Sequence, residues 1–162
     1  MPDLAQFTVK ELLGIASRAE IDAHKTYTEL ASSVKNPLLK EKFQWLAFEE
    51  NKHKESLLKL FQSLFREDKM AIPEQGDQAL LPSIHFTPDS SLVDILLQAM
   101  KAEKAAAEFY SNLAQKVQDP QHRILDYLSH VEHSHHEMLK SEYTMALEFE
   151  DYGEQDIEKV VT

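Results

Sequence analysis

Two stretches of the sequence decide the fold: residues 46–57 read LAFEENKHKESL, and residues 128–139 read LSHVEHSHHEML. In both, a leucine is followed by a glutamate after 4 residues, a histidine after 3 more and a second leucine after another 4. This spacing places the four side chains on one face of an α-helix. Both stretches therefore predict a helix whose inward face carries a glutamate and a histidine: Glu50 with His53, and Glu132 with His135.

A second repeat pairs residues 16–31 (ASRAEIDAHKTYTELA) with residues 99–114 (AMKAEKAAAEFYSNLA). The seven identical positions all fall on one helical face, and every position off that face differs. We therefore expect the shared face to point into the protein. It carries a glutamate and a tyrosine in each helix: Glu20 with Tyr27, and Glu103 with Tyr110.

Capping residues mark where four helices begin. They are Thr8 in a capping box with Glu11, Asn36 before Pro37, Ser90 or Ser91, and Asp119 before Pro120. The predicted helices span about residues 8–35, 37–66, 90–118 and 120–150. With only 3 glycines and 6 prolines in 162 residues, the chain has few breakers to interrupt them.

The connections between these helices predict their arrangement. Tight turns join the first helix to the second and the third to the fourth, so each pair forms an antiparallel hairpin. Residues 67–89 hold three prolines and are long enough to travel the length of the bundle. We therefore predict an all-α, ferritin-like four-helix bundle over residues 1–147, with two hairpins joined by a long crossover. Residues 148–162 form an acidic C-terminal extension in this prediction.

The four inward glutamates lie at one level of the predicted bundle. Glu20 and Glu50 are equally distant from the first turn, and Glu103 and Glu132 from the second. Four buried carboxylates repel one another, and no lysine or arginine falls on the repeated faces. Two divalent cations would balance these charges.

The donor types indicate which metals fit. One glutamate from each of two helices, with Glu-x-x-His from each of the other two, is the ligand set of di-iron and di-manganese bundles. Oxygen donors with one imidazole per metal favour iron or manganese over copper. We expect two iron ions, with manganese as the alternative. His136 is an alternative to His135 as a ligand and Glu49 to Glu50, but the repeat favours His135 and Glu50.

The composition excludes several other functions. The 17 basic and 28 acidic residues give a net charge of −11, which argues against binding nucleic acid or an anionic membrane. No apolar run is long enough for a membrane span, and the first ten residues show no signal peptide. The absence of cysteine excludes disulfides, thiolate zinc sites and iron–sulfur clusters, and suits a cytoplasmic protein.

The motifs resemble those of the rubrerythrin branch of the ferritin-like di-iron proteins, over about residues 9–145. The resemblance implies that Glu20 and Glu103 are terminal ligands and that Glu50 and Glu132 bridge the metals. It implies one nitrogen ligand each from His53 and His135. Tyr27 and Tyr110 resemble the tyrosines that hydrogen-bond the ligand carboxylates in that family, and they are the candidate catalytic residues beside the metal.

Two features depart from that family. Rubrerythrins carry a rubredoxin domain with cysteines, and this chain has none, so reductive turnover would need an external electron donor. Rubrerythrins also carry an extra glutamate that is linked to a redox-driven ligand switch, where this chain has Ala106.

We expect a di-iron oxidoreductase that reacts ferrous iron with hydrogen peroxide or dioxygen. We also expect the protein to be a homodimer. The alternatives are a non-catalytic iron-binding or iron-handling module and an interaction protein with structural metal.

Other side chains have more ordinary explanations. Four histidines near the motifs are expected to pack or to face solvent: His24, His130, His133 and His136. Four apolar residues are expected to form core at the end of the bundle or a dimer surface: Phe61, Leu64, Phe65 and Met70.

Overall fold

The computed structural model describes residues 3–149, and they form four long helices. After the short 3₁₀ helix η1 (Leu4–Gln6), the helices are α1 (Val9–Ser33), α2 (Pro37–Leu64), α3 (Leu92–Ala114) and α4 (Gln121–Glu148). This confirms the predicted all-α bundle. The predicted acidic extension lies outside the described residues from residue 150 onward.

Three of the four predicted helix caps are correct. The Thr8 side chain accepts a hydrogen bond from the Glu11 amide, and the Glu11 carboxylate accepts one from the Thr8 amide, which completes the capping box of α1. Asn36 Oδ1 accepts hydrogen bonds from the first amides of α2. Ser91, rather than Ser90, caps α3 by accepting from the Asp94 amide.

The turn between α3 and α4 differs from the prediction. The residue in the N-cap position of α4 is Pro120, which has no side-chain acceptor, and the Asp119 carboxylate pairs with Arg123 at 3.2 Å instead. Helix α3 ends at Ala114 rather than near 118, because the next three amides bond to carbonyls three residues back in a tighter turn. The imidazole of His122 binds the carbonyl oxygen of Ala114 at 2.7 Å and so satisfies the end of α3.

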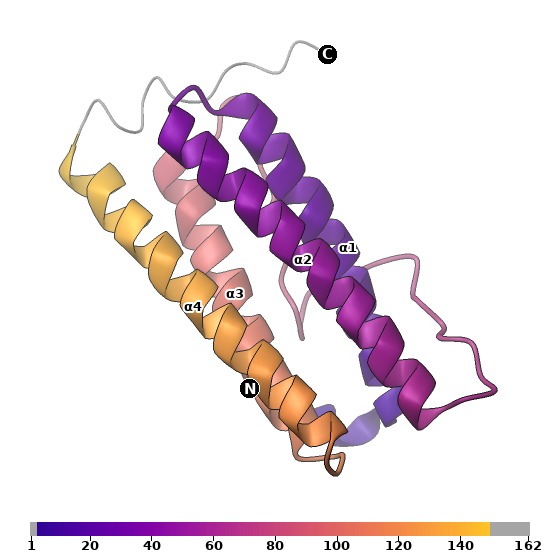
Figure 1. The fold of residues 1–162 in the computed structure, drawn as a ribbon. Coiled ribbons are helices and arrows are strands. Elements are labelled where there is room, and N and C mark those ends of the chain that lie inside the picture. Colours follow the sequence, from indigo (N-terminus) through magenta and orange to yellow (C-terminus); the bar gives the residue numbers. More distant parts are fainter. Residues whose placement is uncertain (1–2, 150–162) are drawn as a thin grey trace.

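The helices form two hairpins, α1 with α2 and α3 with α4 (Figure 1). Residues 65–91 connect the far end of α2 to the opposite end of the bundle, so α2 and α3 run in the same direction, as predicted (Figure 1). The crossover packs closely on α1 at Gly14, where an added Cβ would lie 2.1 Å from the carbonyl oxygen of Ala71. Leu80, Leu81 and Ile84 of the crossover are buried.

Each helix passes through two apolar clusters with a polar level between them. One cluster includes Leu12, Leu57, Phe109 and Leu128, and the other includes Leu30, Leu46, Leu96 and Leu139. The buried glutamates and histidines fall between these residues on every helix. Phe61 is buried in the first cluster, and Leu64, Phe65 and Met70 pack against it, so they belong to the core at that end of the bundle.

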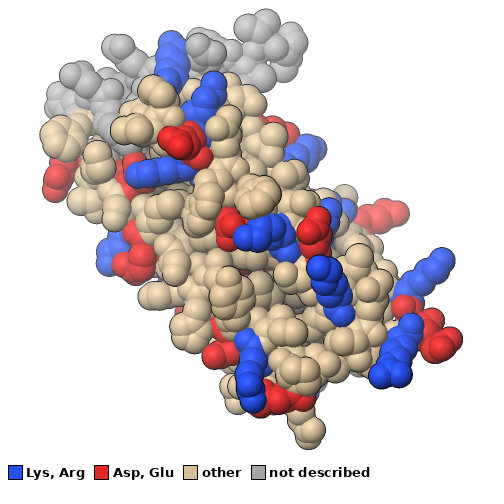
Figure 2. Space-filling view, in the orientation of Figure 1, with Lys and Arg blue, Asp and Glu red and all other residues tan. Residues whose placement is uncertain are grey.

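The outer surface carries mixed charge. On the face shown in Figure 2, basic and acidic side chains are interspersed, with no continuous basic patch. That face therefore has no continuous positive surface to which a phosphate backbone could bind. Within the described residues, no helix combines the length and apolar character that crossing a bilayer requires.

Candidate metal centre

Six polar side chains are buried at the level between the two apolar clusters. Each retains at most 4% exposure: Glu20 on α1, Glu50 and His53 on α2, Glu103 on α3, and Glu132 and His135 on α4. All six were predicted from the two repeats, and the bundle brings all six together. Their roles as metal ligands remain a prediction.

The six residues form two overlapping groups. Glu20, Glu50, His53 and Glu132 each place one donor atom within 4.8 Å of the others, and so do Glu50, Glu103, Glu132 and His135. Glu50 and Glu132 belong to both groups. Two positions for a cation therefore lie side by side, with the shared carboxylates between them.

Both imidazoles present Nδ1 to the carboxylates. His53 Nδ1 lies 3.0 Å from Glu132 Oε1 and 3.1 Å from Glu50 Oε2. His135 Nδ1 lies 3.0 Å from Glu132 Oε2 and 3.6 Å from both Glu50 Oε1 and Glu103 Oε2. The two rings are nearly parallel, with centroids 5.6 Å apart. Each four-residue group thus contains one histidine, and both histidines point Nδ1 toward the carboxylates of their group.

Two buried tyrosines connect the hairpins at this level. The Tyr27 hydroxyl of α1 donates a hydrogen bond to Glu103 of α3, and the Tyr110 hydroxyl of α3 donates one to Glu20 of α1. The sequence places each tyrosine on the same face as the glutamate of its own helix, but the structure pairs it with the glutamate of the other. This exchange holds both non-shared carboxylates in place.

Burial controls the protonation of the carboxylates. Loss of solvent and the neighbouring negative charges raise the pKa of Glu20 and Glu50, and they raise the pKa of Glu132 to about 8. Burial acts in the same direction on Glu103, but the close, positively charged His135 ring outweighs burial and lowers the pKa of Glu103 to about 2.

The histidines show the opposite balance. Burial would lower the pKa of His53, but its hydrogen bond to Glu132 and the close carboxylate of Glu50 raise it to about 11. Close approach of the Glu103, Glu132 and Glu50 carboxylates raises the pKa of His135, again against the effect of burial. In the metal-free protein, protons therefore supply the positive charge that the carboxylates need. A bound cation must displace these protons.

The unpaired atoms of the centre fit a metal. Glu50 Oε2, Glu132 Oε2 and both ring nitrogens of His135 are buried without a hydrogen-bond partner in the described part of the chain. Buried polar atoms without partners are rare in folded proteins. Oxygen and imidazole donors that converge from four helices are the donor set that divalent iron or manganese prefers.

A cavity of about 60 Å³ opens onto the carboxylates between α1, α3 and the crossover. All four glutamates and both tyrosines line it. Gly76 and residues 81–84 of the crossover cover the cavity. Its wall also contains four alanines, whose small side chains leave it open: Ala19, Ala23, Ala102 and Ala106. The volume admits a few water-sized molecules.

The other candidate histidines lie outside the centre. His24 and His136 each bond a backbone carbonyl with Nδ1, that of Ala47 at 2.7 Å and that of Met100 at 2.9 Å. His130 bonds its own helix at the Asp126 carbonyl, and His133 is exposed. His136 therefore faces α3 rather than the carboxylates.

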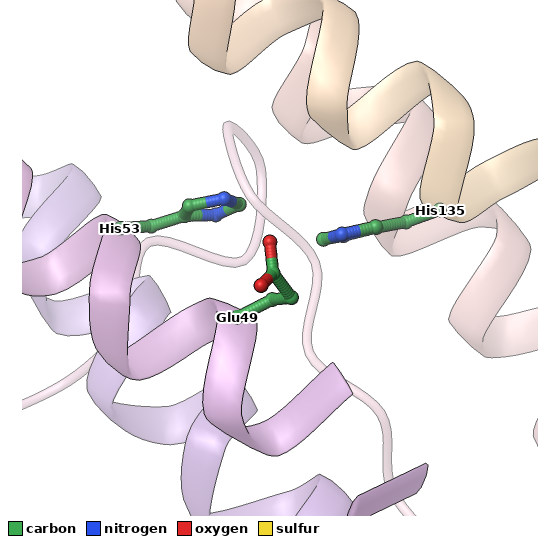
Figure 3. Close-up of side chains that lie close together, drawn as sticks. All are labelled: Glu49, His53 and His135. Atoms are coloured by element: carbon green, nitrogen blue, oxygen red, sulfur yellow. The ribbon is translucent and has the colours of Figure 1, made fainter. Parts of the chain in front are cut away.

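Glu49 lies beside the centre, although the sequence indicates it only as an alternative to Glu50. It forms a third group with His53 and His135 and points between them (Figure 3). The repeat carries no signal for it, because the equivalent position on α4 is Val131.

A buried cluster of four glutamates and two histidines in a bundle with one long crossover defines a ferritin-like carboxylate protein. The chain belongs to the rubrerythrin family, whose family model matches residues 11–143. Family membership and the buried clusters together indicate metal binding.

Solved structures share this fold. A hypothetical protein from Pyrococcus furiosus is 36% identical, with 90% of this chain and 94% of that chain covered and a TM-score of 0.78. CopM in its silver-bound form is 13% identical, with coverage of 86% and 98% and a TM-score of 0.66. CopM in its Cu(I)-bound form is 14% identical, with the same coverage and TM-score, and both CopM structures inform the fold alone. No curated protein matches the chain.

Proposed function

We propose that this protein binds two iron ions side by side and oxidises them from the ferrous state with hydrogen peroxide or dioxygen. One observation carries the proposal: two groups of four donors share the carboxylates of Glu50 and Glu132. Shared carboxylates are the feature that allows two metals to sit within a few ångströms of each other. Glu20 and Glu103 are the terminal ligands in this proposal, with one imidazole for each metal.

A pair of ferrous ions would supply the two electrons that, with two protons, reduce one hydrogen peroxide to two waters or one dioxygen to hydrogen peroxide. The residues of the chain set the conditions for this chemistry. Tyr27 and Tyr110 hold the terminal carboxylates through their hydrogen bonds, and the apolar clusters on both sides exclude bulk water. The same hard donors would also accept manganese.

The cavity between α1 and α3 supports a small oxidant. It reaches all four glutamates and is walled by alanines, so a molecule of the size of peroxide or dioxygen fits beside the metals. The crossover above it restricts access to larger substrates. The oxidant therefore approaches from the side of the tyrosines.

Repeated turnover needs electrons from outside the chain. Without cysteine the chain holds no iron–sulfur cluster, so an external electron donor must reduce the iron again. This need is also what favours the second candidate function, an iron-binding or iron-handling module that does not turn over.

Rapid mixing separates these two functions. Anaerobic protein loaded with ferrous iron is mixed with hydrogen peroxide or with dioxygen, and the absorbance of ferric iron is followed. The proposed oxidoreductase is oxidised by at least one of them faster than free ferrous iron under the same conditions. Oxidation by neither, or at the rate of free iron only, would favour the non-catalytic module.

We also propose that the protein is a homodimer. Trp45 and Phe48 on α2 and Tyr127 on α4 are large side chains with exposures of 45%, 60% and 65%. Exposed aromatic residues are enriched in protein interfaces. Sedimentation equilibrium tests this, and a monomer at micromolar concentration would contradict it.

A further inference from the structure

Glu49 lies at the edge of the metal centre, against the two histidines. Its carboxylate points between His53 of α2 and His135 of α4 (Figure 3), and one of its oxygens and one ring nitrogen of each histidine lie within 4.8 Å of one another. Its side chain is 13% exposed, and Lys52 Nζ lies 3.0 Å from its Oε1. Glu49 is thus a largely buried carboxylate that is not one of the six proposed ligands.

Each ring has a second nitrogen, Nε2, besides the Nδ1 that faces the carboxylates. Nδ1 of both rings faces the carboxylates of the centre, at 3.0 Å from Glu132 in each case. A neutral imidazole that donates its Nδ1 lone pair to a metal carries its proton on Nε2. A buried N–H needs an acceptor, yet Nε2 of His135 has no hydrogen-bond partner among the described residues.

The chemistry of imidazole decides what Glu49 does. A ring nitrogen that carries a proton has no lone pair for a metal, so Glu49, His53 and His135 do not hold a third cation while Nδ1 binds the first two. A carboxylate has two acceptor oxygens and can serve both rings at once. The atoms lie within 4.8 Å of one another, a separation that one bridging water can span.

The repeat gives Glu49 no counterpart. The 82-residue offset that superimposes Glu50 on Glu132 and His53 on His135 places Val131 opposite Glu49. Of the two repeated motifs, the one on α2 therefore carries a carboxylate at this position and the one on α4 does not. Loss of Glu49 would leave both imidazoles without this acceptor.

We infer that Glu49 is a positioning residue that accepts the Nε2–H protons of His53 and His135 and so fixes both rings with Nδ1 toward the metals. This inference rests on the proposed metal pair. An outer carboxylate of this kind holds the ring orientation and makes the imidazole a stronger ligand. Its removal lowers metal affinity without changing the number of metals bound.

The test compares Glu49→Ala and Glu49→Gln with the wild type, with Co²⁺ as the probe. Loss of an outer partner of a metal-bound histidine costs about 10–100-fold in metal affinity. We expect Glu49→Ala to bind two Co²⁺ with affinity reduced by about that factor. Glu49→Gln, whose amide oxygen still accepts a hydrogen bond, recovers part of the loss. Glu55→Gln removes the same charge from an exposed position of α2 and leaves the affinity unchanged.

A second measurement distinguishes positioning from a general structural effect. In the NMR spectrum of the Co²⁺-loaded wild type, two exchangeable Nε2–H signals should persist, and in Glu49→Ala they should broaden through exchange with water. Unchanged signals and affinity in Glu49→Ala would overturn the inference while the metal pair stands. A wild type that does not bind two Co²⁺ would overturn the metal pair and this inference together.

Discussion

At the scale of single residues, the centre is a balance of buried charges. Four carboxylates at no more than 4% exposure repel one another, and protonated imidazoles offset that repulsion when no metal is bound. The six residues were predictable because both repeats place them on inward faces at matching heights. The exchange of Tyr27 and Tyr110 between hairpins was not, because it depends on how the two hairpins face each other.

Glu50→Gln tests the repulsion directly. Burial and the charges of Glu132 and Glu103 raise the pKa of Glu50, so its charge is unfavourable in the metal-free fold. The neutral amide should raise the melting temperature of the metal-free protein by a few degrees, since about 1 kcal/mol corresponds to about 2–4 °C at this size. The same change should lower the melting temperature with ferrous iron present. Calorimetry with and without metal measures both, and a less stable metal-free variant would contradict mutual burial.

The pH dependence of the metal-free protein follows from the same groups. Glu132 with a raised pKa of about 8 and His53 with one of about 11 make the folded state hold more protons than the unfolded state. As pH rises, the stabilisation by protonated Glu132 is therefore lost between about pH 4.5 and 8. The stabilisation by protonated His53 is lost between about pH 6.5 and 11. Glu103, with its lowered pKa of about 2, acts oppositely and only below about pH 4.5.

We thus expect metal-free protein to melt at a higher temperature at pH 5.5 than at pH 8.5. One pKa unit is about 1.4 kcal/mol, which is enough to be measured. Metal-loaded protein should show the reverse trend, because its ligands must be deprotonated. Thermal melts with a chelator and with metal decide this, and a metal-free protein that gains stability toward pH 8.5 would contradict it.

At the scale of elements, the sequence patterns predict the helices well and the connections between them less well. The capping residues Thr8 and Asn36 fixed two helix starts in advance. The predicted end of α3 and the predicted Asp119 cap of α4 were wrong. A tight turn ends α3 early, and Asp119 pairs with Arg123 instead of capping α4, and no periodic pattern reveals either feature. The crossover was predicted from its prolines and its length. Its path over α1 depends on a contact at Gly14, which the sequence does not reveal.

Gly14→Ala tests that contact. The added methyl group would lie 2.1 Å from the Ala71 carbonyl oxygen, so the crossover backbone must shift. We expect a loss of about 1–3 kcal/mol in the free energy of unfolding, measured with urea. Gly76→Ala is the matched control, since its Cβ meets the end of the Gln78 side chain at 3.2 Å, which can move aside. Equal effects of the two changes would show that the Gly14 contact is not special.

At the scale of the whole molecule, two hairpins and a crossover enclose the candidate metal centre and a small cavity beside it. Ala106 lines that cavity, where the rubrerythrin pattern has an additional glutamate. In the proposed di-iron site, the metals would then have no extra ligand to exchange between oxidation states. The centre should therefore discriminate weakly between its oxidants.

We expect ferrous protein to react with hydrogen peroxide and with dioxygen at rates of the same order of magnitude. Ala106→Glu should shift the ratio of rates toward peroxide, and Ala106→Gln, which fills the cavity similarly without the charge, should not. Stopped-flow mixing with each oxidant measures the ratios. A wild-type peroxide rate thousands of times the dioxygen rate would show that selectivity does not need the extra carboxylate.

The central claim is that Glu50 and Glu132 bridge two metal ions, and metal stoichiometry tests it most directly. Metal-free protein is titrated anaerobically with ferrous iron, and bound iron is counted after separation from free metal. We predict saturation at two equivalents for the wild type and loss of the paired site when both glutamates are replaced by alanine. Saturation at one equivalent, or two equivalents retained in the double variant, would contradict the account.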